Sequence, residues 1–250
     1  MIIIKSVKEI EKMRQAGRVA AQAMEKVLAA VRPGVTTGEL DRIAFDYIIG
    51  AGATPSFKGY GGFPGSICAS VNEQVVHGIP GHRRLREGDI LSIDMGAYLH
   101  GFHSDMARTV GVGQISPEAQ QLIDITKESF YRGIAQAIAG NRIFHISKAI
   151  EEYAVENGVS VVRELIGHGV GQDLHEAPDV PNFVSRFKGP VLRPGMTIAV
   201  EPMLNLGTPK VVEADDGWTV STLDGKLSAH YENTIAIMPE GPCEILTAAE

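Results

Sequence analysis

Cysteine is scarce in this chain of 250 residues, which contains only Cys68 and Cys243. Two cysteines so far apart form neither a disulfide framework nor a zinc knuckle, and they favour a reducing compartment. A secretory leader is lacking, because Lys5 and Lys8 closely follow the apolar start from Met1 to Ile4, and no window is apolar for the length of a membrane span. The sequence therefore predicts a cytoplasmic protein with no membrane partner.

An excess of positive charge is lacking as well. The 23 lysines and arginines are outnumbered by 30 aspartates and glutamates, which gives a formal net charge of -7. Because a dedicated nucleic-acid binder normally presents a basic face, this balance argues against DNA as a partner. The main exception is the basic run of Arg83, Arg84 and Arg86 beside His82. We interpret it first as a solvated loop, and the alternative that stays open is a contact with ribosomal RNA phosphates.

What the sequence does contain is an internal repeat. A gapless match pairs Asp94 with Glu201, a second match pairs Asp105 with Glu232, and a weaker third match pairs His77 with His168. Each half also begins with two helical patterns that precede its strands. The repeat predicts a single domain over residues 1–250, built from two pseudo-symmetric halves at about 6–113 and 116–239.

Apolar residues at helical spacing indicate the first helix, and capping or ending residues mark the other three. The helices are expected at about 6–31, from after Thr36-Thr37 to Gly50 or Gly52, from Ser116 onward, and from Ser147 to Gly158. In each half, two successive strands follow the helices, and each of these strands carries one acidic residue. The predicted fold class is α+β, an antiparallel sheet shared by the two halves with helices on one face.

Two acidic residues of the first half are predicted to face each other across a hairpin. Residues 89–97 form a strand on which Ser92 and Asp94 share one face, and a turn at His100-Gly101 sends the chain back. Because Asp94 and Asp105 are nearly equidistant from that turn, the hairpin brings them across from each other. Two unpaired carboxylates would repel each other there, and a shared cation is the usual resolution.

The second half repeats this arrangement with glutamates. Glu201 directly follows the apolar run Thr197–Val200, and Glu232 lies within the strand expected at 229–237. His168 stands between glycines, which let the backbone approach a ligand closely. Four carboxylates with one imidazole suit two divalent ions of Mn, Fe, Co or Zn. Each residue alone has a structural alternative, such as a hydrogen-bonded acid, but four structural acids at matching repeat positions are not expected.

The order and spacing of five residues resemble those of the metal ligands of the creatinase-like pita-bread metallopeptidases, peptidase family M24: Asp94, Asp105, His168, Glu201 and Glu232. The segments Val75–Pro80 and Gly167–Glu176 resemble the signatures of type I methionine aminopeptidases within that family. The likeness extends from about Ile10 to Ile245. It implies a curved antiparallel sheet in two pseudo-symmetric halves, covered by helices, and a dinuclear divalent metal centre.

The resemblance also implies a role for each residue. Asp94 would hold one ion through both oxygens, Asp105 and Glu232 would bridge the two ions, and His168 and Glu201 would complete the shell of the second ion. A hydroxide between the ions would attack the peptide, and Glu201 would pass its proton to the leaving amine. His77 would contact the scissile amide, and His175 would donate a hydrogen bond to the oxyanion.

A closed apolar pocket for a methionine side chain is implied too. The residues at the matching positions are Phe57, Tyr60, Phe63, Cys68, Leu174 and Trp218, and His77 and His175 complete the set expected to contact the substrate. Trp218 has the alternative role of a packed hairpin residue, and Leu174 stands where some relatives carry an aromatic. The implied activity is hydrolytic removal of the initiator methionine from nascent polypeptides with a small second residue, by a cytoplasmic monomer. The ribosome near its tunnel exit is a candidate partner.

Three alternatives agree less well with the sequence. Proline-specific aminopeptidases and prolidases share the fold, but they usually carry a large domain before the catalytic one. A type II methionine aminopeptidase has an insertion in its second half, whereas only 33 positions separate His168 from Glu201 here. An inactive peptide-binding module would have lost one or more metal ligands, and all five are present.

Overall fold

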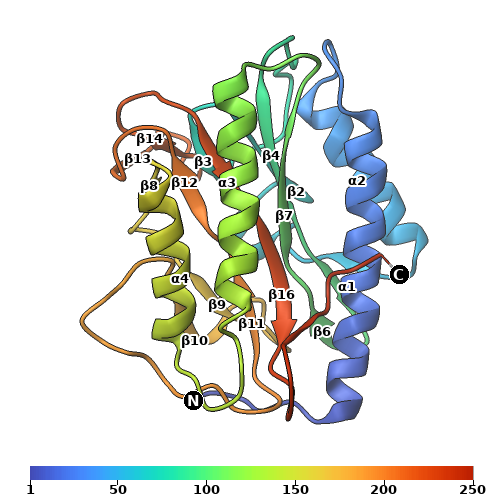
Figure 1. Ribbon diagram of the computed structural model, residues 1–250. Coiled ribbons are helices and arrows are strands. Elements are labelled where there is room, and N and C mark those ends of the chain that lie inside the picture. Colours follow the sequence, from blue (N-terminus) through green and yellow to red (C-terminus); the bar gives the residue numbers. More distant parts are fainter. Residues whose placement is uncertain (250) are drawn as a thin grey trace.

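Three of the four α-helices begin where the sequence suggests. The computed structural model describes residues 1–249, and its helices are α1 (Val7–Ala30), α2 (Thr37–Gly50), α3 (Pro117–Ile134) and α4 (Ile143–Glu156) (Figure 1). Ser6 and Thr36 each close a capping box with a glutamate three residues on, and the Ser116 hydroxyl accepts from the backbone of Ala119. These local hydrogen bonds fix three of the four starts as expected.

The start of α4 differs from the expectation. The helix begins at Ile143 rather than at Ser147, and Ser147 lies buried inside it. The Ser147 hydroxyl donates to the carbonyl oxygens of Ile143 and Pro181, so it does not cap the helix. Because Ile143, Ile146 and Ile150 recur at helical spacing and are all buried, the apolar stripe extends the helix by one turn.

The central sheet has eight antiparallel strands in the order β10-β9-β11-β16-β7-β4-β2, with β17 also paired to β16. These strands are β2 (Ile67–Val71), β4 (Ile90–Met95), β7 (Met106–Gly111), β9 (Gly167–Gly169), β10 (Glu176–Val180), β11 (Thr197–Val200), β16 (Glu232–Ala236) and β17 (Glu244–Ile245). Strands β7 and β16, which belong to different halves of the chain, lie side by side at its middle (Figure 1).

Three small sheets and one short helix extend this core. The first small sheet contains β1 (Thr54–Pro55), β5 (Ala97–Leu99) and β6 (Phe102–His103), and the second contains β15 (Ser228–His230), β12 (Met203–Asn205) and β8 (Ser160–Val161). The third contains β13 (Val211–Glu213), β14 (Val220–Thr222) and β3 (Gln74–Val76). The short helix is the 3₁₀ helix Tyr60–Gly62. Within residues 1–249, no helix combines the length and the apolar character that crossing a membrane requires.

The register where the halves meet is symmetric about the two strands. Glu232 pairs with Ala107 and Asn233 pairs with Met106. One step further along, Thr234 donates its backbone N–H to the carbonyl oxygen of Asp105. Glu232 therefore lies opposite Ala107, two positions beyond Asp105. In the same way, Asp105 lies opposite Thr234, two positions beyond Glu232.

The predicted hairpin forms, but its register differs from the expected one. His100 and Gly101 both adopt positive φ angles at the turn, as a tight hairpin requires. The ladder between β4 and β7 sets Asp94 opposite Ala107, so Asp105 is a diagonal neighbour of Asp94 rather than directly across from it. An offset of two residues keeps both side chains on one face, because the side-chain period of a strand is two.

The sheet separates an apolar core from an acidic face. One buried cluster packs α1 and α2 against Leu91, Ile93 and Met95, and another packs α3 and α4 against strands β11 and β16. Figure 1 shows α3 crossing one face of the sheet, with α1 and α2 beside it. Residues between these core positions, such as Asp94 and Glu201, point to the opposite face because side chains alternate along a strand.

Candidate active site

One cavity of about 240 Å³ brings together all of the side chains that the sequence predicted for the site. Its lining contains Phe57, Tyr60, Phe63, Cys68, His77, Asp94, Asp105, His168, Leu174, His175, Glu201, Trp218 and Glu232. It also contains Val76, Leu165, Ile166 and Met203, which the sequence did not single out. The latter four are ordinary apolar residues of strands and loops, and nothing in their spacing distinguishes them from core residues.

The four acids reach the cavity from four chain segments. Asp94 stands near the end of β4, Asp105 directly precedes β7, Glu201 directly follows β11 and Glu232 begins β16. Asp105 and Glu232 are almost fully buried, at 4% and 2% exposed. The antiparallel ladders thus bring carboxylates that are far apart in sequence to one place.

His168 lies against this acidic cluster with a defined tautomer. Its Nε2 atom is 3.7 Å from Asp105 Oδ2 and 3.6 Å from Glu201 Oε1, while Nδ1 is 2.8 Å from the carbonyl oxygen of Gly169. A carbonyl oxygen only accepts, so Nδ1 carries the proton and donates it. Burial lowers the pKa of His168 to about 4, so the ring is neutral and Nε2 presents a lone pair to the acids.

Two further histidines border the cavity. His77 follows β3 directly with a φ of 58°, a left-handed conformation that is uncommon outside glycine, and its ring lies 6.5 Å from the Trp218 ring. His175 Nδ1 is 2.8 Å from the hydroxyl of Tyr60. Burial lowers the pKa of His77 and that of His175, which favours the neutral rings near pH 7.

The apolar end of the cavity is a buried cluster formed by Phe57, Phe63, Cys68 and Leu174, with Ile79 and Trp218 packed against it. The Trp218 ring meets Phe63 edge-on, with 5.1 Å between the ring centroids, and it also lines the cavity. Trp218 therefore has both roles considered for it, that of a packed residue and that of a pocket residue. Cys68 stands opposite Asp94 in the β2–β4 ladder. Burial raises the pKa of the Cys68 thiol well above its usual range, so the sulfur stays protonated and behaves as a small apolar group.

Comparison with known proteins agrees with this geometry. The model of metallopeptidase family M24 matches residues 11–239. The chain belongs to family M24. One M24 relative, the methionine aminopeptidase of Clostridium perfringens, is 57% identical over 247 residues, which are 99% of this chain and 99% of that protein.

Solved structures extend the likeness to the fold. The crystal structure of methionine aminopeptidase from Thermotoga maritima superposes with a TM-score of 0.97 at 41% identity and covers 99% of this chain and 100% of its own. A prolidase from Pyrococcus furiosus shares the fold alone, with a TM-score of 0.78 at 23% identity, over 99% of this chain and 66% of its own. The predicted family and pita-bread fold are confirmed.

The acids of this M24 chain fit the divalent cations that a metallopeptidase requires. Burial raises the pKa of Asp94 to about 7 and holds the pKa values of Asp105, Glu201 and Glu232 well above their usual range. One oxygen of each of Asp94, Asp105 and Glu232 is buried without a hydrogen-bond partner within residues 1–249. Buried carboxylates need such partners, and shared cations supply them.

Two overlapping groups of side chains are close enough to hold one cation each. Asp105, His168 and Glu232 form one group, and Asp94, His230 and Glu232 form the other, with the ligand atoms of each group within 4.8 Å of one another. Glu232 belongs to both groups. This sharing suits a dinuclear centre with a bridging carboxylate.

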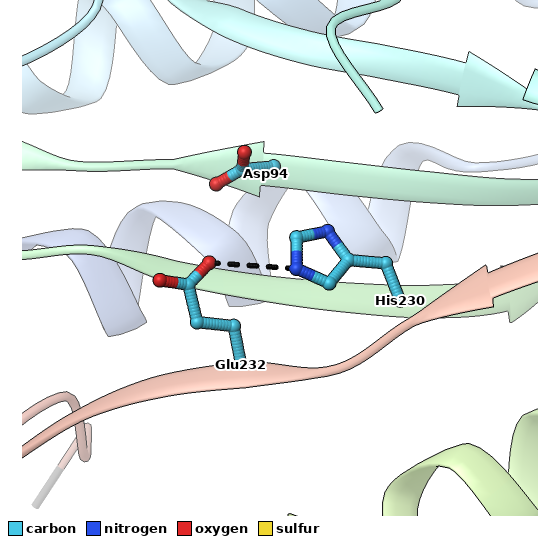
Figure 2. A group of neighbouring side chains, drawn as sticks. All are labelled: Asp94, His230 and Glu232. Atoms are coloured by element: carbon cyan, nitrogen blue, oxygen red, sulfur yellow. Dashed lines mark ion pairs between the residues drawn. The ribbon is translucent and has the colours of Figure 1, made fainter. Parts of the chain in front are cut away.

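His230 is the residue that sequence reasoning missed. Figure 2 shows its ring beside Asp94 and Glu232, and its Nε2 is 3.7 Å from Glu232 Oε2 and 3.9 Å from Glu201 Oε2. The side chain is buried, and neither ring nitrogen has a hydrogen-bond partner within residues 1–249. Burial lowers the pKa of His230 to about 3, so the ring is neutral and can act as a ligand.

The repeat contained a signal for His230, but an ambiguous one. The second match aligns it with His103, so the two histidines are equivalent by sequence. In the structure His103 lies elsewhere, with Nδ1 3.0 Å from Ser56 Oγ and its ring 4.5 Å from that of Tyr98. Only one of the two repeat-equivalent histidines therefore faces the acids.

Proposed function

We propose that this M24 chain removes the N-terminal methionine from polypeptides by metal-dependent hydrolysis. The observation that carries the proposal is the placement of a carboxylate cluster with orphaned oxygens at one end of a cavity whose other end is apolar. Such a cavity has room for one amino-terminal side chain beside the reacting carbonyl. The high identity to methionine aminopeptidases over nearly the whole chain supports the same activity.

Five residues are proposed to hold two divalent cations. Asp94 would hold one cation, Asp105 and Glu232 would be shared by the two sites, and His168 and Glu201 would complete the other site. When bound, the two cations supply a nucleophile by lowering the pKa of water and polarise the carbonyl of the scissile bond. Co, Mn, Fe and Zn all suit these oxygen and nitrogen donors, so the ligand set does not choose among them.

Glu201 is proposed to carry the proton between the attacking water and the leaving amine. A shuttle must accept and then release a proton near the working pH. Burial raises the pKa of Glu201 well above its usual range, which moves this carboxylate in the required direction. One of its oxygens lies toward His168 and the other toward His230, so the carboxylate is held between two neutral rings.

His175 is proposed to stabilise the oxyanion as a hydrogen-bond donor. The Tyr60 hydroxyl can donate to His175 Nδ1, which leaves the ring proton on Nε2. A neutral imidazole with its proton on Nε2 can donate this hydrogen bond without adding a positive charge to the site in the ground state. His77 is proposed to contact the scissile amide, and its lowered pKa keeps it neutral as well.

The apolar cluster is proposed to select methionine. Phe57, Phe63 and Trp218 surround the Cys68 thiol, and such a wall suits a flexible and polarisable thioether. Leu174 occupies the wall position at which an aromatic was expected in some relatives, and it is buried at 2% exposure. A charged first residue would lose its hydration there without a partner, so it is excluded.

The natural substrates are proposed to be nascent polypeptides in the cytoplasm, cleaved by a monomer. Docking near the ribosomal tunnel exit would use the basic run, in which Arg83, Arg84 and Arg86 are all exposed. Arg84 also donates to the carbonyl oxygen of Gly34, so part of this run has a structural role. Neutralising Arg83 and Arg86 together, which leaves Arg84 in place, should weaken cosedimentation with ribosomes while turnover of short peptides is unchanged.

The direct test measures released amino acids from short peptides. Protein stripped with a chelator and then given one divalent metal at a time is incubated with Met-Gly-Met-Met or with the matching Pro-initiated peptide. We expect methionine release only from the first peptide and only with metal. The Glu232→Gln variant is assayed in the same way. Glu25→Gln is its matched control, because Glu25 is an exposed acid on α1. Release of proline, or turnover by fully stripped protein, would contradict the proposal.

A further inference from the structure

A buried ion pair joins the N-terminal segment to the loop that carries His175. Lys5 precedes α1, and its ammonium group pairs with the carboxylate of Glu176, the first residue of β10. The two side chains are 2% and 4% exposed. Lysine and glutamate are seldom buried to this degree unless they are paired. The pair is therefore a specific feature of the fold rather than a surface contact.

Glu176 organises the turn that leads into His175. Its Oε1 atom accepts a hydrogen bond from the backbone of Asp173 at 3.4 Å. Its carboxylate also passes so close to Gly171 that a Cβ atom there would lie 2.2 Å from Oε1. Gly171 in turn donates its backbone N–H to the carbonyl oxygen of Asp173. The carboxylate thus fills the inside of the 171–176 loop.

The same loop carries two residues of the proposed active site. Leu174 forms part of the apolar wall, and His175 is adjacent in sequence to Glu176. The His175 ring is held from the other side by the hydroxyl of Tyr60 and lies 4.1 Å from the His168 ring. The position of His175 is therefore set at its ring by the Tyr60 hydroxyl and at its backbone by the adjacent Glu176.

We propose that the Lys5–Glu176 ion pair is a positioning device that holds His175 at the distance its role requires. Without Lys5 the Glu176 carboxylate is buried and unpaired, and it moves toward solvent or admits water into the loop. Either response displaces His175. A shift of about 1 Å in a catalytic group can cost roughly 10²-fold in rate. The inference rests on the proposed function, because it assigns the pair a role through His175.

The simpler alternative is that the pair only anchors the N-terminus. Lys5 also donates its backbone N–H to the carbonyl oxygen of Gly195, which anchors this segment in any case. The chain offers a matched control in Arg14, whose guanidinium pairs with Glu244 and ties α1 to β17. Arg14→Met removes an anchoring pair of the same N-terminal region without touching the loop, so it should change kcat by less than about 2-fold.

A double-mutant cycle with His175 separates the two roles. Lys5→Met, His175→Ala and the double variant are assayed for kcat and KM on a Met-Gly peptide, with metal content measured in each. We expect Lys5→Met to lower kcat about 10- to 100-fold with KM and metal content nearly unchanged. In the His175→Ala background the same change should cost less than about 3-fold, because the group it positions is gone. Lys5→Arg should restore part of the rate.

The results that would overturn the inference differ from the result that would refute the proposed function. Equal losses from Lys5→Met in both backgrounds, or a wild-type kcat in a folded Lys5→Met protein, would overturn the inference. If Lys5→Met does not fold, Glu176→Gln takes its place in the cycle, since the amide keeps an acceptor oxygen for Asp173. A wild-type protein that releases no methionine refutes the proposed function instead. The positioning is then still measured by NMR of carbon-13-labelled histidine, in which Lys5→Met should shift the His175 signal and leave that of His145 in place.

Discussion

The hydroxyl of Thr234 bridges both backbone polar groups of Asp105: it accepts from the N–H at 2.9 Å and donates to the carbonyl oxygen at 2.9 Å. The two residues belong to different halves of the repeat, on strand β16 and just before β7. Thr234 is buried at 1% exposure. An acid of one half of the metal site is therefore held in place by the other half.

Thr234→Val should destabilise the protein because it removes this bridge while keeping the shape of the side chain. The Asp105 N–H is then buried without a partner, which costs about 1–3 kcal/mol in the free energy of unfolding. Urea denaturation of the metal-free protein measures this loss. Thr234→Ser keeps the hydroxyl and serves as the control, with an expected loss well below that of valine. A Thr234→Val protein that is no less stable than Thr234→Ser would show that the hydroxyl bridge contributes no more to stability than the methyl group does.

Asp105→Ala or Glu232→Ala should abolish turnover and metal retention together. Each acid is proposed to bridge both cations, so each loss removes a ligand from two sites at once. Metal content after gel filtration and methionine release from a Met-Gly peptide are the paired measurements. A variant that retains two equivalents of metal and cleaves at the wild-type rate would refute the ligand assignment.

His230→Ala should weaken the retention of the cation on the Asp94 side. The ring of His230 lies with Asp94 and Glu232 in one group that could hold a cation, so its loss removes the ring nitrogen beside those two acids. Competition with a coloured chelator should show one of two cations released at least about 10-fold more readily, since supporting groups of metal ligands are commonly worth that much. The visible absorption of the Co(II)-loaded protein should change as well. His103→Ala is the control, because its ring bonds to Ser56 instead. Identical spectra and metal release for wild type and His230→Ala would show that His230 neither binds nor supports that cation.

Removal of the cations should make the stability of the protein fall as the pH rises above about 7. Burial raises the pKa of Asp94 from 3.8 to about 7, so the folded metal-free state holds a proton that the unfolded state releases. This contribution to stability is fully present below about pH 4 and is lost as the pH rises through about 7. Asp105, Glu201 and Glu232 shift in the same direction.

Urea midpoints at pH 7.0, 7.5 and 8.0, with chelator and with excess metal, measure this dependence. The window lies above the unfolded histidine pKa of about 6.5, because buried histidines with lowered pKa values, such as His168 and His230, change the stability in the opposite direction below it. Cations replace the protons, so the loaded protein should gain stability relative to the metal-free protein as the pH rises. The capping acids Glu9 and Glu39 do not confuse the comparison, because hydrogen bonds to the N-cap serines and threonines lower their pKa values and keep them ionised throughout. A metal-free midpoint that increases between pH 7 and pH 8 would contradict the expectation.

Cleavage should depend steeply on the second residue of the substrate. The substrate carbonyl has to reach the carboxylate cluster, which draws the second side chain between His77 and His175 at the border of the cavity. A long side chain there displaces the carbonyl, and about 1 Å of displacement can cost roughly 10²-fold. We expect kcat/KM for Met-Gly peptides to exceed that for Met-Lys peptides by about that factor. Comparable values for the two peptides would show that these histidines do not restrict the second position.

Short-range features of this protein were predictable because they depend on residues close together in the chain. The start of α2 after Thr36, with Glu39 three residues on, was expected, and the structure has a capping box there. The acids Asp94 and Glu201 were recognisable because a charged residue that joins a buried strand needs a partner. The repeat then indicated that these acids converge, since equivalent strands of two similar halves meet in one sheet.

What the sequence by itself determined is the presence of the four helices, the family and most of the residues that line the cavity. What only the tertiary structure decided is how distant segments meet. The diagonal offset of Asp94 and Asp105, the choice of His230 over His103 and the burial of Lys5 against Glu176 all depend on strand register and on packing between segments many residues apart. Sequence periodicity specifies which face a side chain occupies, but two registers that differ by two residues share the same face. The free energy of packing the whole sheet against its helices selects between them.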